Sequence, residues 1–138
     1  MKKEYLLPLN ELDLLAKDLI KHIDDRDLVV ILRGDLASGK TTLVKNIVKA
    51  MNIDDNVTSP TFSLQSVYGE NIFHYDVYNK TLQEFISLGM LEEFENSGVH
   101  FVEWGDEQLQ NLLEDYGFEV MVINIFKEND KRQYIIEA

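Results

Sequence analysis

The segment GDLASGKT at residues 34–41 constrains the fold of this chain more than any other, because it fits the pattern G-x-x-x-x-G-K-[ST] of phosphate-binding P-loops. The pattern is informative only between a strand and a helix. Residues 28–32 form a continuous apolar run rich in β-branched side chains, typical of a strand buried on both faces of a parallel sheet. After Gly39, apolar residues recur at helical spacing as far as Met51. The sequence therefore predicts a strand, a P-loop and a helix in succession.

The residue types of this loop suit an anionic ligand. Backbone N–H groups and the positive end of the helix dipole form an anion site. Gly34 and Gly39 allow tight turns where a Cβ would intrude. Lys40 would reach the β- and γ-phosphates, and the Thr41 hydroxyl would bind Mg²⁺. The alternative is a glycine-bearing turn that binds nothing. The candidate nucleotide-binding residues of the loop are Asp35, Leu36, Ala37, Ser38, Gly39, Lys40, Thr41 and Thr42.

Length and charge limit the remaining possibilities. A chain of 138 residues predicts one domain, residues 1–138. No apolar run reaches the length of a membrane span, no signal-peptide core is visible, and cysteine is absent, so we expect a cytoplasmic protein without a membrane partner. The net charge of −12, from 13 basic and 25 acidic residues, argues against tight nucleic-acid binding through this chain. Proteins with basic faces are the expected partners.

The N-terminal segment predicts an edge strand and a packing helix. Residues 3–7 have strand character that ends at Pro8, and Asn10 is the expected N-cap of the helix that follows. One stripe of that helix is apolar and predicts burial: Leu12, Leu15, Leu19 and Ile23.

The second half of the chain predicts two hairpins and several short helices. Strands are expected at residues 62–68 and 71–78 around Gly69-Glu70, and at residues 118–127 and 132–137. Residues 81–94 have helical tendency interrupted at Gly89, and residues 108–113 form a short polar helix or turn. The predicted fold is α/β, with a mainly parallel sheet around the P-loop strand and antiparallel hairpins at its periphery.

Two carboxylates are candidates for the metal site. Residues 99–103 form an apolar strand that ends in Glu103, as in a Walker B strand whose acid holds Mg²⁺. Its alternative is a core strand with a charged end. Asp76 lies near another strand end, where an aspartate is often a turn or cap residue. Trp104 follows Glu103 and either walls the site or packs. His74 and His100 are interpreted as structural or surface residues, because the histidines lack metal-ligand spacing.

The loop after the P-loop helix contains hydroxyl residues and a proline. In P-loop enzymes, this loop commonly supplies a hydroxyl that senses the γ-phosphate and Mg²⁺. Thr58, Ser59 and Thr61 are therefore candidate switch residues. An ordinary turn, in which Pro60 favours an extended Ser59, explains the same composition.

Four motifs, taken in order, resemble one known family. They are GDLASGKTT at 34–42, TSPTF at 58–62, HYDVY at 74–78 and VEW at 102–104. With these motifs the chain resembles the TsaE (YjeE) family over nearly its whole length, and the last three are much more specific than the P-loop. This family is the small P-loop ATPase of bacterial tRNA threonylcarbamoyladenosine biosynthesis.

The resemblance implies a P-loop NTPase fold, ATP and Mg²⁺ as ligands, and slow ATP hydrolysis. It implies TsaD and TsaB as partners, which transfer a threonylcarbamoyl group to an adenosine beside the anticodon, so that this chain meets tRNA only indirectly. The implied roles follow. Lys40 holds phosphates, Thr41 and Glu103 bind magnesium, Thr61 is a switch residue, Asp76 supports catalysis, Trp104 is important to the site, and adenine lies between Leu9 and Arg132.

Two positions depart from the family pattern. Ala37 stands where the family usually has glycine, so a positive φ there would add strain. Asn79, followed by Lys80, stands where the family often has arginine after D-x-Y.

The arginines predict slow turnover by the isolated chain. There are only three, and Arg26 and Arg33 lie at the two ends of the P-loop strand, poorly placed for the γ-phosphate. We therefore expect a partner to accelerate hydrolysis. A small-molecule kinase or a nucleotide-dependent adaptor remains an alternative, although a kinase usually requires a lid with several arginines. A GTPase is disfavoured, since Thr81-Leu82 after Asn79-Lys80 breaks the N-K-x-D motif.

Overall fold

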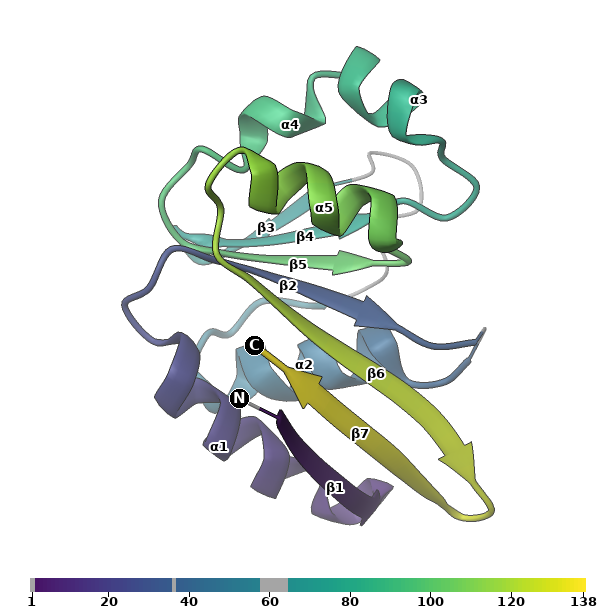
Figure 1. Cartoon of the computed structure of the whole chain (residues 1–138). Helices are drawn as coiled ribbons and strands as arrows, with labels where there is room; N and C mark the ends of the chain where they lie inside the picture. Colours follow the sequence, from purple (N-terminus) through teal and green to yellow (C-terminus); the bar gives the residue numbers. More distant parts are fainter. Residues whose placement is uncertain (1, 36, 58–64) are drawn as a thin grey trace.

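The computed structural model describes residues 2–35, 37–57 and 65–138, and their strands form one mixed sheet with helices on both faces (Figure 1). The strand order is β1-β7-β6-β2-β5-β4-β3. The strands are β1 (Lys2–Pro8), β2 (Leu28–Arg33), β3 (Gln65–Tyr68), β4 (Ile72–Asp76), β5 (Val99–Glu103), β6 (Val120–Glu128) and β7 (Lys131–Glu137). The predicted α/β class is confirmed.

The centre of the sheet is parallel. Strand β2 pairs in parallel with both β5 and β6, and β4 pairs in parallel with β5. The pairs β1–β7, β6–β7 and β3–β4 are antiparallel. Strand β6 therefore belongs to the parallel centre and also to the C-terminal hairpin. The expected parallel sheet with antiparallel hairpins towards its edges is confirmed.

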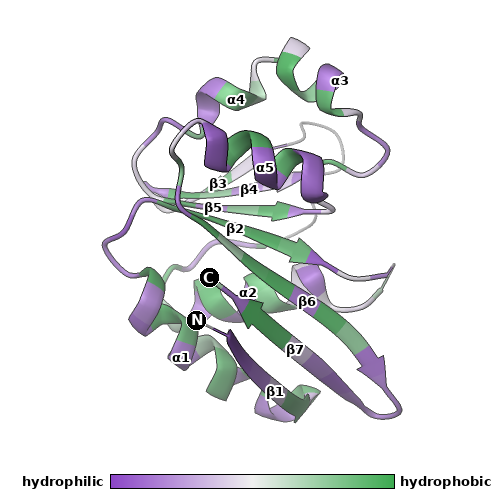
Figure 2. Ribbon diagram, viewed as in Figure 1, coloured by the Kyte–Doolittle hydropathy of each residue, from purple (hydrophilic) through white to green (hydrophobic). Residues whose placement is uncertain are grey.

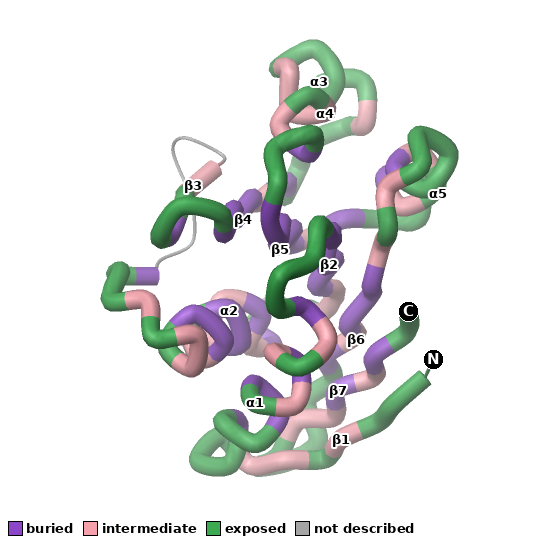
Figure 3. Tube along the Cα trace, turned by 90° about the vertical axis from the view of Figure 1, so that its left-hand side faces the viewer, coloured by how far each residue is buried: buried purple, intermediate pink, exposed green. Residues whose placement is uncertain are grey.

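Two groups of helices cover the two faces of the sheet (Figure 1). Helices α1 (Leu12–Ile23) and α2 (Lys40–Ala50) pack on one face, where they share an apolar core with β2, β6 and β7. Helices α3 (Leu82–Ser87), α4 (Met90–Glu93) and α5 (Glu107–Asp115) lie over the other face. The central strands are apolar (Figure 2) and are buried between these layers (Figure 3).

The P-loop strand is enclosed on its edges and on both faces. The residues from Leu28 to Leu32 are all at most 3% exposed, because β2 has a strand on each side and helices on each face. The continuous apolar run was the sequence signal for this position. Within the described ranges, every helix is too short or too polar to cross a membrane.

The N-terminal elements follow the prediction except at one cap. Strand β1 is an edge strand that ends at Pro8, as expected, and the apolar stripe of α1 is buried. The expected N-cap at Asn10 is wrong. Pro8, with φ −70° and ψ 163°, is followed by a 3-10 turn (η1, Leu9–Glu11), so Asn10 lies inside that turn and α1 begins at Leu12 without a side-chain cap.

The later elements also follow their turn residues. The hairpin around Gly69-Glu70 is confirmed over β3 and β4, while residues 62–64 of the predicted strand lie outside the described residues. The helical segment is interrupted at Gly89, whose φ is 76°, as predicted. Helix α5 is longer than the predicted 108–113 and buries Leu109 and Leu113.

Candidate nucleotide-binding site

The P-loop and the candidate acids meet at one edge of the sheet. The loop connects the carboxyl end of β2 to the amino end of α2, and the parallel register places Leu32 of β2 and Asp76 of β4 on either side of Glu103 in β5. Open parallel sheets bind ligands at the carboxyl ends of their strands. The topology therefore brings Asp76 and Glu103 to the same edge as the loop.

The loop backbone requires its glycines. A Cβ on Gly34 would lie 2.4 Å from the Ser38 Oγ and 2.8 Å from the Ile125 carbonyl oxygen, which is too close for any real side chain. Gly39 has φ 109° where the chain enters α2. Ala37 has φ 60°, the left-handed conformation that the sequence analysis treated as a source of strain. The Ser38 N–H closes the turn on the Asp35 carbonyl at 2.9 Å.

Lys40 lies within the loop beneath Trp104. Its Nζ donates to the carbonyl oxygens of Gly34 at 2.8 Å and Asp35 at 3.0 Å. The same Nζ is 3.8 Å from the centroid of the Trp104 ring, a cation–π contact. Burial lowers the pKa of Lys40, and the Glu103, Asp76 and Asp35 carboxylates oppose this shift. The ammonium group is thus held at the site by neutral carbonyl acceptors that a phosphate can replace.

Thr41 and Glu103 form a direct hydroxyl–carboxylate pair. The Thr41 hydroxyl donates to Glu103 Oε2 at 2.7 Å, and Glu103 is 3% exposed. Mg²⁺ prefers a few hard oxygen ligands from the protein and completes its shell with phosphate oxygens and waters. No cluster of three or more metal-binding side chains occurs among the described residues. The pair therefore has the donor chemistry of a Mg²⁺ site that is completed by a nucleotide.

His74 is the site residue that sequence reasoning missed. It is fully buried, and its Nε2 lies 2.6 Å from Glu103 Oε2, while its Nδ1 lies 2.9 Å from the Tyr68 hydroxyl. The sequence alone predicts a structural or surface residue at this position. The available signal was that His74 and Asp76 share one face of their strand. Their proximity to Glu103 required the strand order, which the sequence did not supply.

Trp104 has an unusual backbone for a bulky residue. Its φ is 71°, and its N–H donates to the Leu32 carbonyl of the P-loop strand at 3.1 Å. Its ring lies 4.8 Å from that of Tyr78, measured between centroids, in addition to its contact with Lys40. A non-glycine residue in this region is uncommon and marks a constrained position.

One pocket of about 390 Å³ is lined by Lys40, Thr41, Glu103 and Trp104 together. Its volume is in the range of small-molecule sites. Arg132 of β7 reaches it from the C-terminal hairpin and lies against Gly39, where an added Cβ would be 3.4 Å from the Arg132 Cδ. The Arg132 Nε is buried without a hydrogen-bond partner among the described residues. The pocket is lined by Ala37, Ser38, Gly39, Lys40, Thr41, Thr42, Asp76, Glu103, Trp104 and Arg132.

The other candidates lie elsewhere or outside the described residues. Leu9 is 58% exposed in η1 and does not line this pocket. The Asp76 Oδ1 accepts a hydrogen bond from the Tyr78 N–H at 3.0 Å, so Asp76 has the predicted alternative role in a turn and also lines the pocket. Leu36 and the switch candidates Thr58, Ser59 and Thr61 are outside the described ranges.

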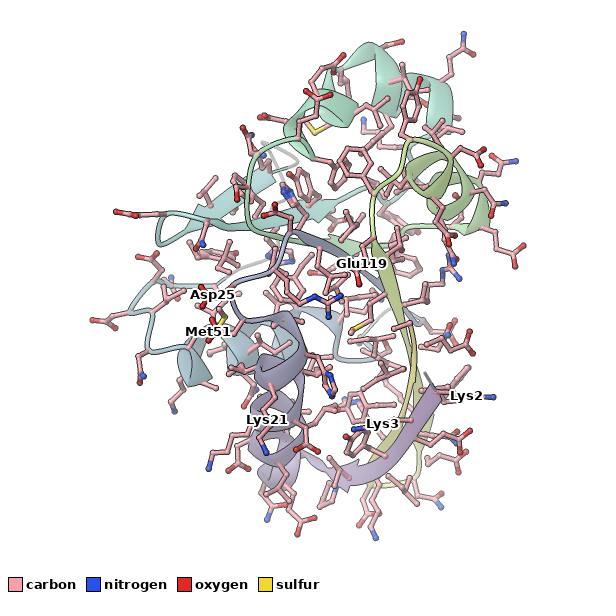
Figure 4. The ribbon with its side chains drawn as sticks, turned by 60° about the vertical axis from the view of Figure 1, so that its left-hand side comes forward. Lys2, Lys3, Lys21, Asp25, Met51 and Glu119 are labelled. Atoms are coloured by element: carbon pink, nitrogen blue, oxygen red, sulfur yellow. The ribbon has the colours of Figure 1, made fainter. Side chains whose placement is uncertain are left out.

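Two of the three arginines are held away from Lys40. Arg26 pairs with Glu119, which is labelled in Figure 4, and with the His22 carbonyl. Arg33 donates to the Gly105 carbonyl and to Gln110 of α5, each at 2.8 Å. Neither arginine lines the pocket.

Comparison with known proteins identifies the family. The family model described as threonylcarbamoyl adenosine biosynthesis protein TsaE matches residues 8–135. The protein of that function from Treponema pallidum is 39% identical over 89 residues, covering 62% of this chain and 66% of the relative. The Haemophilus influenzae protein is 31% identical over 121 residues, covering 85% of this chain and 74% of the relative. The match covers 64% of the Nostoc relative, at 35% identity and over 66% of this chain.

A solved structure supports the fold. The crystal structure of YdiB from Bacillus subtilis aligns with a TM-score of 0.64 at 23% identity, over 100% of this chain and 86% of that chain. At this identity the likeness concerns the fold. Because the family model matches from residue 8 to residue 135 and the sheet carries a P-loop at its centre, the chain belongs to the TsaE family and has the P-loop NTPase fold.

Proposed function

We propose that this protein, as a single domain of residues 1–138, is a Mg²⁺-dependent ATPase of the cytoplasm. In this proposal it acts with TsaD and TsaB in the threonylcarbamoylation of an adenosine next to the anticodon of tRNA. Family membership supports the pathway. The observation that most supports the chemistry is the Thr41–Glu103 pair, at 2.7 Å, beside the buried Lys40 of the P-loop.

The loop and the second helix bind the phosphates in this proposal. Backbone N–H groups at the amino end of α2 donate to phosphate oxygens, and Lys40 exchanges the carbonyls of Gly34 and Asp35 for them. A hydrogen bond from an ammonium group to a phosphate is charge-assisted and stronger than one to a carbonyl. The exchange therefore favours the nucleotide-bound state.

Thr41 and Glu103 hold Mg²⁺, and Asp76 accepts a hydrogen bond from the attacking water. When bound, Mg²⁺ neutralises phosphate charge and orients the transferred group. The register pairing of Asp76 with Glu103 and its position in the lining of the same pocket support this role. Trp104 covers Lys40 and limits the access of bulk water to it.

Arg132 and Leu9 contact the adenine in this proposal, and Thr58, Ser59 and Thr61 respond to the γ-phosphate. A guanidinium group stacks on planar rings. Arg132 has a buried Nε without a partner among the described residues, and its side chain lies against Gly39. Leu7 is the register partner of Arg132, which places η1 at the same end of the sheet as this guanidinium.

Hydrolysis by the isolated chain is slow. Arg26 and Arg33 are occupied elsewhere, so in this proposal the chain lacks an arginine of its own at the γ-phosphate. An arginine finger accelerates such reactions by about 10³- to 10⁵-fold. TsaD and TsaB supply the missing stabilisation, or they couple hydrolysis to a change within the complex. They also contact the tRNA.

Phosphate release with and without TsaD–TsaB tests this function. We expect slow turnover alone and faster single-turnover hydrolysis with both partners. Glu103→Gln should reduce Mg²⁺-dependent turnover by about 100-fold, the upper end of the losses seen when only the residues supporting a metal ligand are removed. The exposed Glu114→Gln in α5 is the matched control and should behave as wild type. Full turnover in Glu103→Gln would contradict the metal assignment, and no hydrolysis with the partners would indicate an adaptor.

A further inference from the structure

A buried polar chain continues from the proposed metal site into the sheet. Glu103 Oε2 receives two hydrogen bonds, one from the Thr41 hydroxyl at 2.7 Å and one from His74 Nε2 at 2.6 Å. His74 Nδ1 is in turn 2.9 Å from the Tyr68 hydroxyl. His74 is fully buried and Tyr68 is 4% exposed. This series of hydrogen bonds therefore joins β3, β4 and β5 to the first residues of α2.

The Glu103 carboxylate determines which atoms of His74 and Tyr68 donate the hydrogens of these bonds. A carboxylate only accepts hydrogen bonds, so His74 Nε2 carries the hydrogen that is donated to Glu103. When the imidazole is neutral, its other nitrogen is an acceptor for the hydrogen of the Tyr68 hydroxyl. Tyr68 thus fixes the tautomer and the ring orientation of His74, and His74 fixes one oxygen of Glu103.

A second tyrosine–histidine pair in the same sheet shows what is special about the first. The Tyr75 hydroxyl lies 2.7 Å from His100 Nδ1, and His100 Nε2 lies 2.8 Å from the Asn96 carbonyl oxygen. Both histidines are almost wholly buried. The His100 pair ends on a backbone carbonyl, away from the P-loop. The His74 pair ends on a carboxylate that the P-loop threonine also contacts.

We propose that His74 is a positioning residue for the magnesium site, and this inference rests on the proposed function. Its Nε2–H holds the Oε2 of Glu103, the same oxygen that the Thr41 hydroxyl contacts. A carboxylate that is 3% exposed depends on its few donors for orientation. Residues that hold a metal ligand in place typically contribute about 10- to 100-fold to metal affinity.

Two substitutions at His74 separate the hydrogen bond to Glu103 from the packing of the ring. The amide nitrogen of glutamine reaches about as far as Nε2, and that of asparagine about as far as Nδ1. His74→Gln therefore keeps a donor for Glu103, whereas His74→Asn keeps only the contact with Tyr68. His100→Gln and His100→Asn are the matched controls, since His100 has the same kind of partners in the same sheet.

The measurement is a Mg²⁺ titration at fixed ATP, followed by the fluorescence of Trp104, the single tryptophan of the chain. We expect His74→Asn to weaken apparent Mg²⁺ affinity by about 10- to 100-fold, with ATP affinity in EDTA unchanged, and His74→Gln to stay near wild type. The His100 variants should also stay near wild type. Thermal unfolding of each variant identifies those that remain folded. If His74→Asn does not fold, the Mg²⁺ affinity of Tyr68→Phe is compared with that of Tyr75→Phe instead. The expected loss of affinity in Tyr68→Phe is then smaller.

Three results would overturn the inference. The first is that folded His74→Asn, or Tyr68→Phe if His74→Asn does not fold, binds Mg²⁺ as tightly as wild type while Glu103→Gln binds it more weakly. The positioning role of His74 would then be wrong, and the proposed function would stand. The second is an equal loss in the His100 controls, which would indicate a general effect of sheet stability. The third is unchanged Mg²⁺ affinity in Glu103→Gln, which would remove the proposed metal site and the role of His74 with it.

Discussion

At the scale of single residues, two strained backbones flank the pocket. Ala37 has φ 60° and Trp104 has φ 71°, and both line the pocket that contains Lys40. A non-glycine residue in this conformation costs about 1–3 kcal/mol. The surrounding hydrogen bonds, from Ser38 to Asp35 and from Trp104 to Leu32, hold the backbone on both sides. Strain of this kind is concentrated at functional sites.

Ala37→Gly should raise the free energy of unfolding by about 1 kcal/mol, because glycine removes the Cβ that disfavours the left-handed conformation. The added freedom of glycine in the unfolded chain reduces this gain. Ala50→Gly, at the end of α2, is the control and should lower stability by about 0.5–1 kcal/mol. Denaturant unfolding measures both. A loss in Ala37→Gly equal to that of the control would show that residue 37 is unstrained.

His100 predicts a pH dependence of stability. Burial lowers its pKa below the ordinary 6.5, although the Asn96 carbonyl and the Asp27 and Glu93 carboxylates oppose this shift. The unfolded chain therefore binds the proton more readily, so the stabilising contribution is complete above pH 6.5 and is lost as pH falls through the lowered pKa. Relative to His100→Gln, wild type should lose stability on going from about pH 7.5 to about pH 5. An increase in its relative stability would contradict the assignment.

At the scale of elements, the local patterns were sufficient for the P-loop unit and insufficient for its surroundings. The strand, loop and helix at residues 28–50 were predictable because each signal lies within a few residues of the next. The Asn10 cap was wrong, since the extended Pro8 leads into a 3-10 turn. The contact between His74 and Glu103 joins residues 29 positions apart and depends on strand order. The contact of Arg132 with Gly39 likewise depends on where the C-terminal hairpin lies.

Helix α5 begins directly after Trp104, Gly105 and Asp106, and Asp106 caps it. The Asp106 Oδ1 accepts the Leu109 N–H at 2.9 Å. Asp106→Ala should lower the free energy of unfolding by about 1 kcal/mol, whereas Asp106→Asn, which retains the cap, should change it by a few tenths. Thermal or denaturant unfolding provides the comparison. Equal losses in the two variants would show that the cap contributes nothing.

At the scale of the whole molecule, the chain is strongly acidic while the charges of its pocket balance. The net charge is −12, and the pocket is lined by two basic residues, Lys40 and Arg132, and two acidic ones, Asp76 and Glu103. Lys2 and Lys3 lie on the edge strand and Lys21 on α1 (Figure 4), and none of the three lines the pocket. With 13 basic residues against 25 acidic ones, the chain has little positive charge with which to neutralise the phosphates of a nucleic acid.

The isolated chain should bind tRNA no more tightly than about 10⁻⁴ M at physiological salt, the weak end of non-specific binding. The reason is that phosphate contacts dominate such affinity and the chain is strongly acidic. A filter-binding assay of the chain alone, and then with TsaD–TsaB, measures this. Tight binding by the chain alone would mean that it contacts tRNA directly.

Calorimetric titration of ATP into the folded protein, with Mg²⁺ and with EDTA, tests whether the P-loop and Glu103 form a nucleotide–magnesium site. We expect one nucleotide per chain, tighter binding with Mg²⁺ than with EDTA in wild type, and little difference between the two conditions in Glu103→Gln. We also expect Lys40→Ala to bind poorly in both conditions. Absence of binding by folded wild-type protein, or binding that neither variant alters, would contradict this assignment.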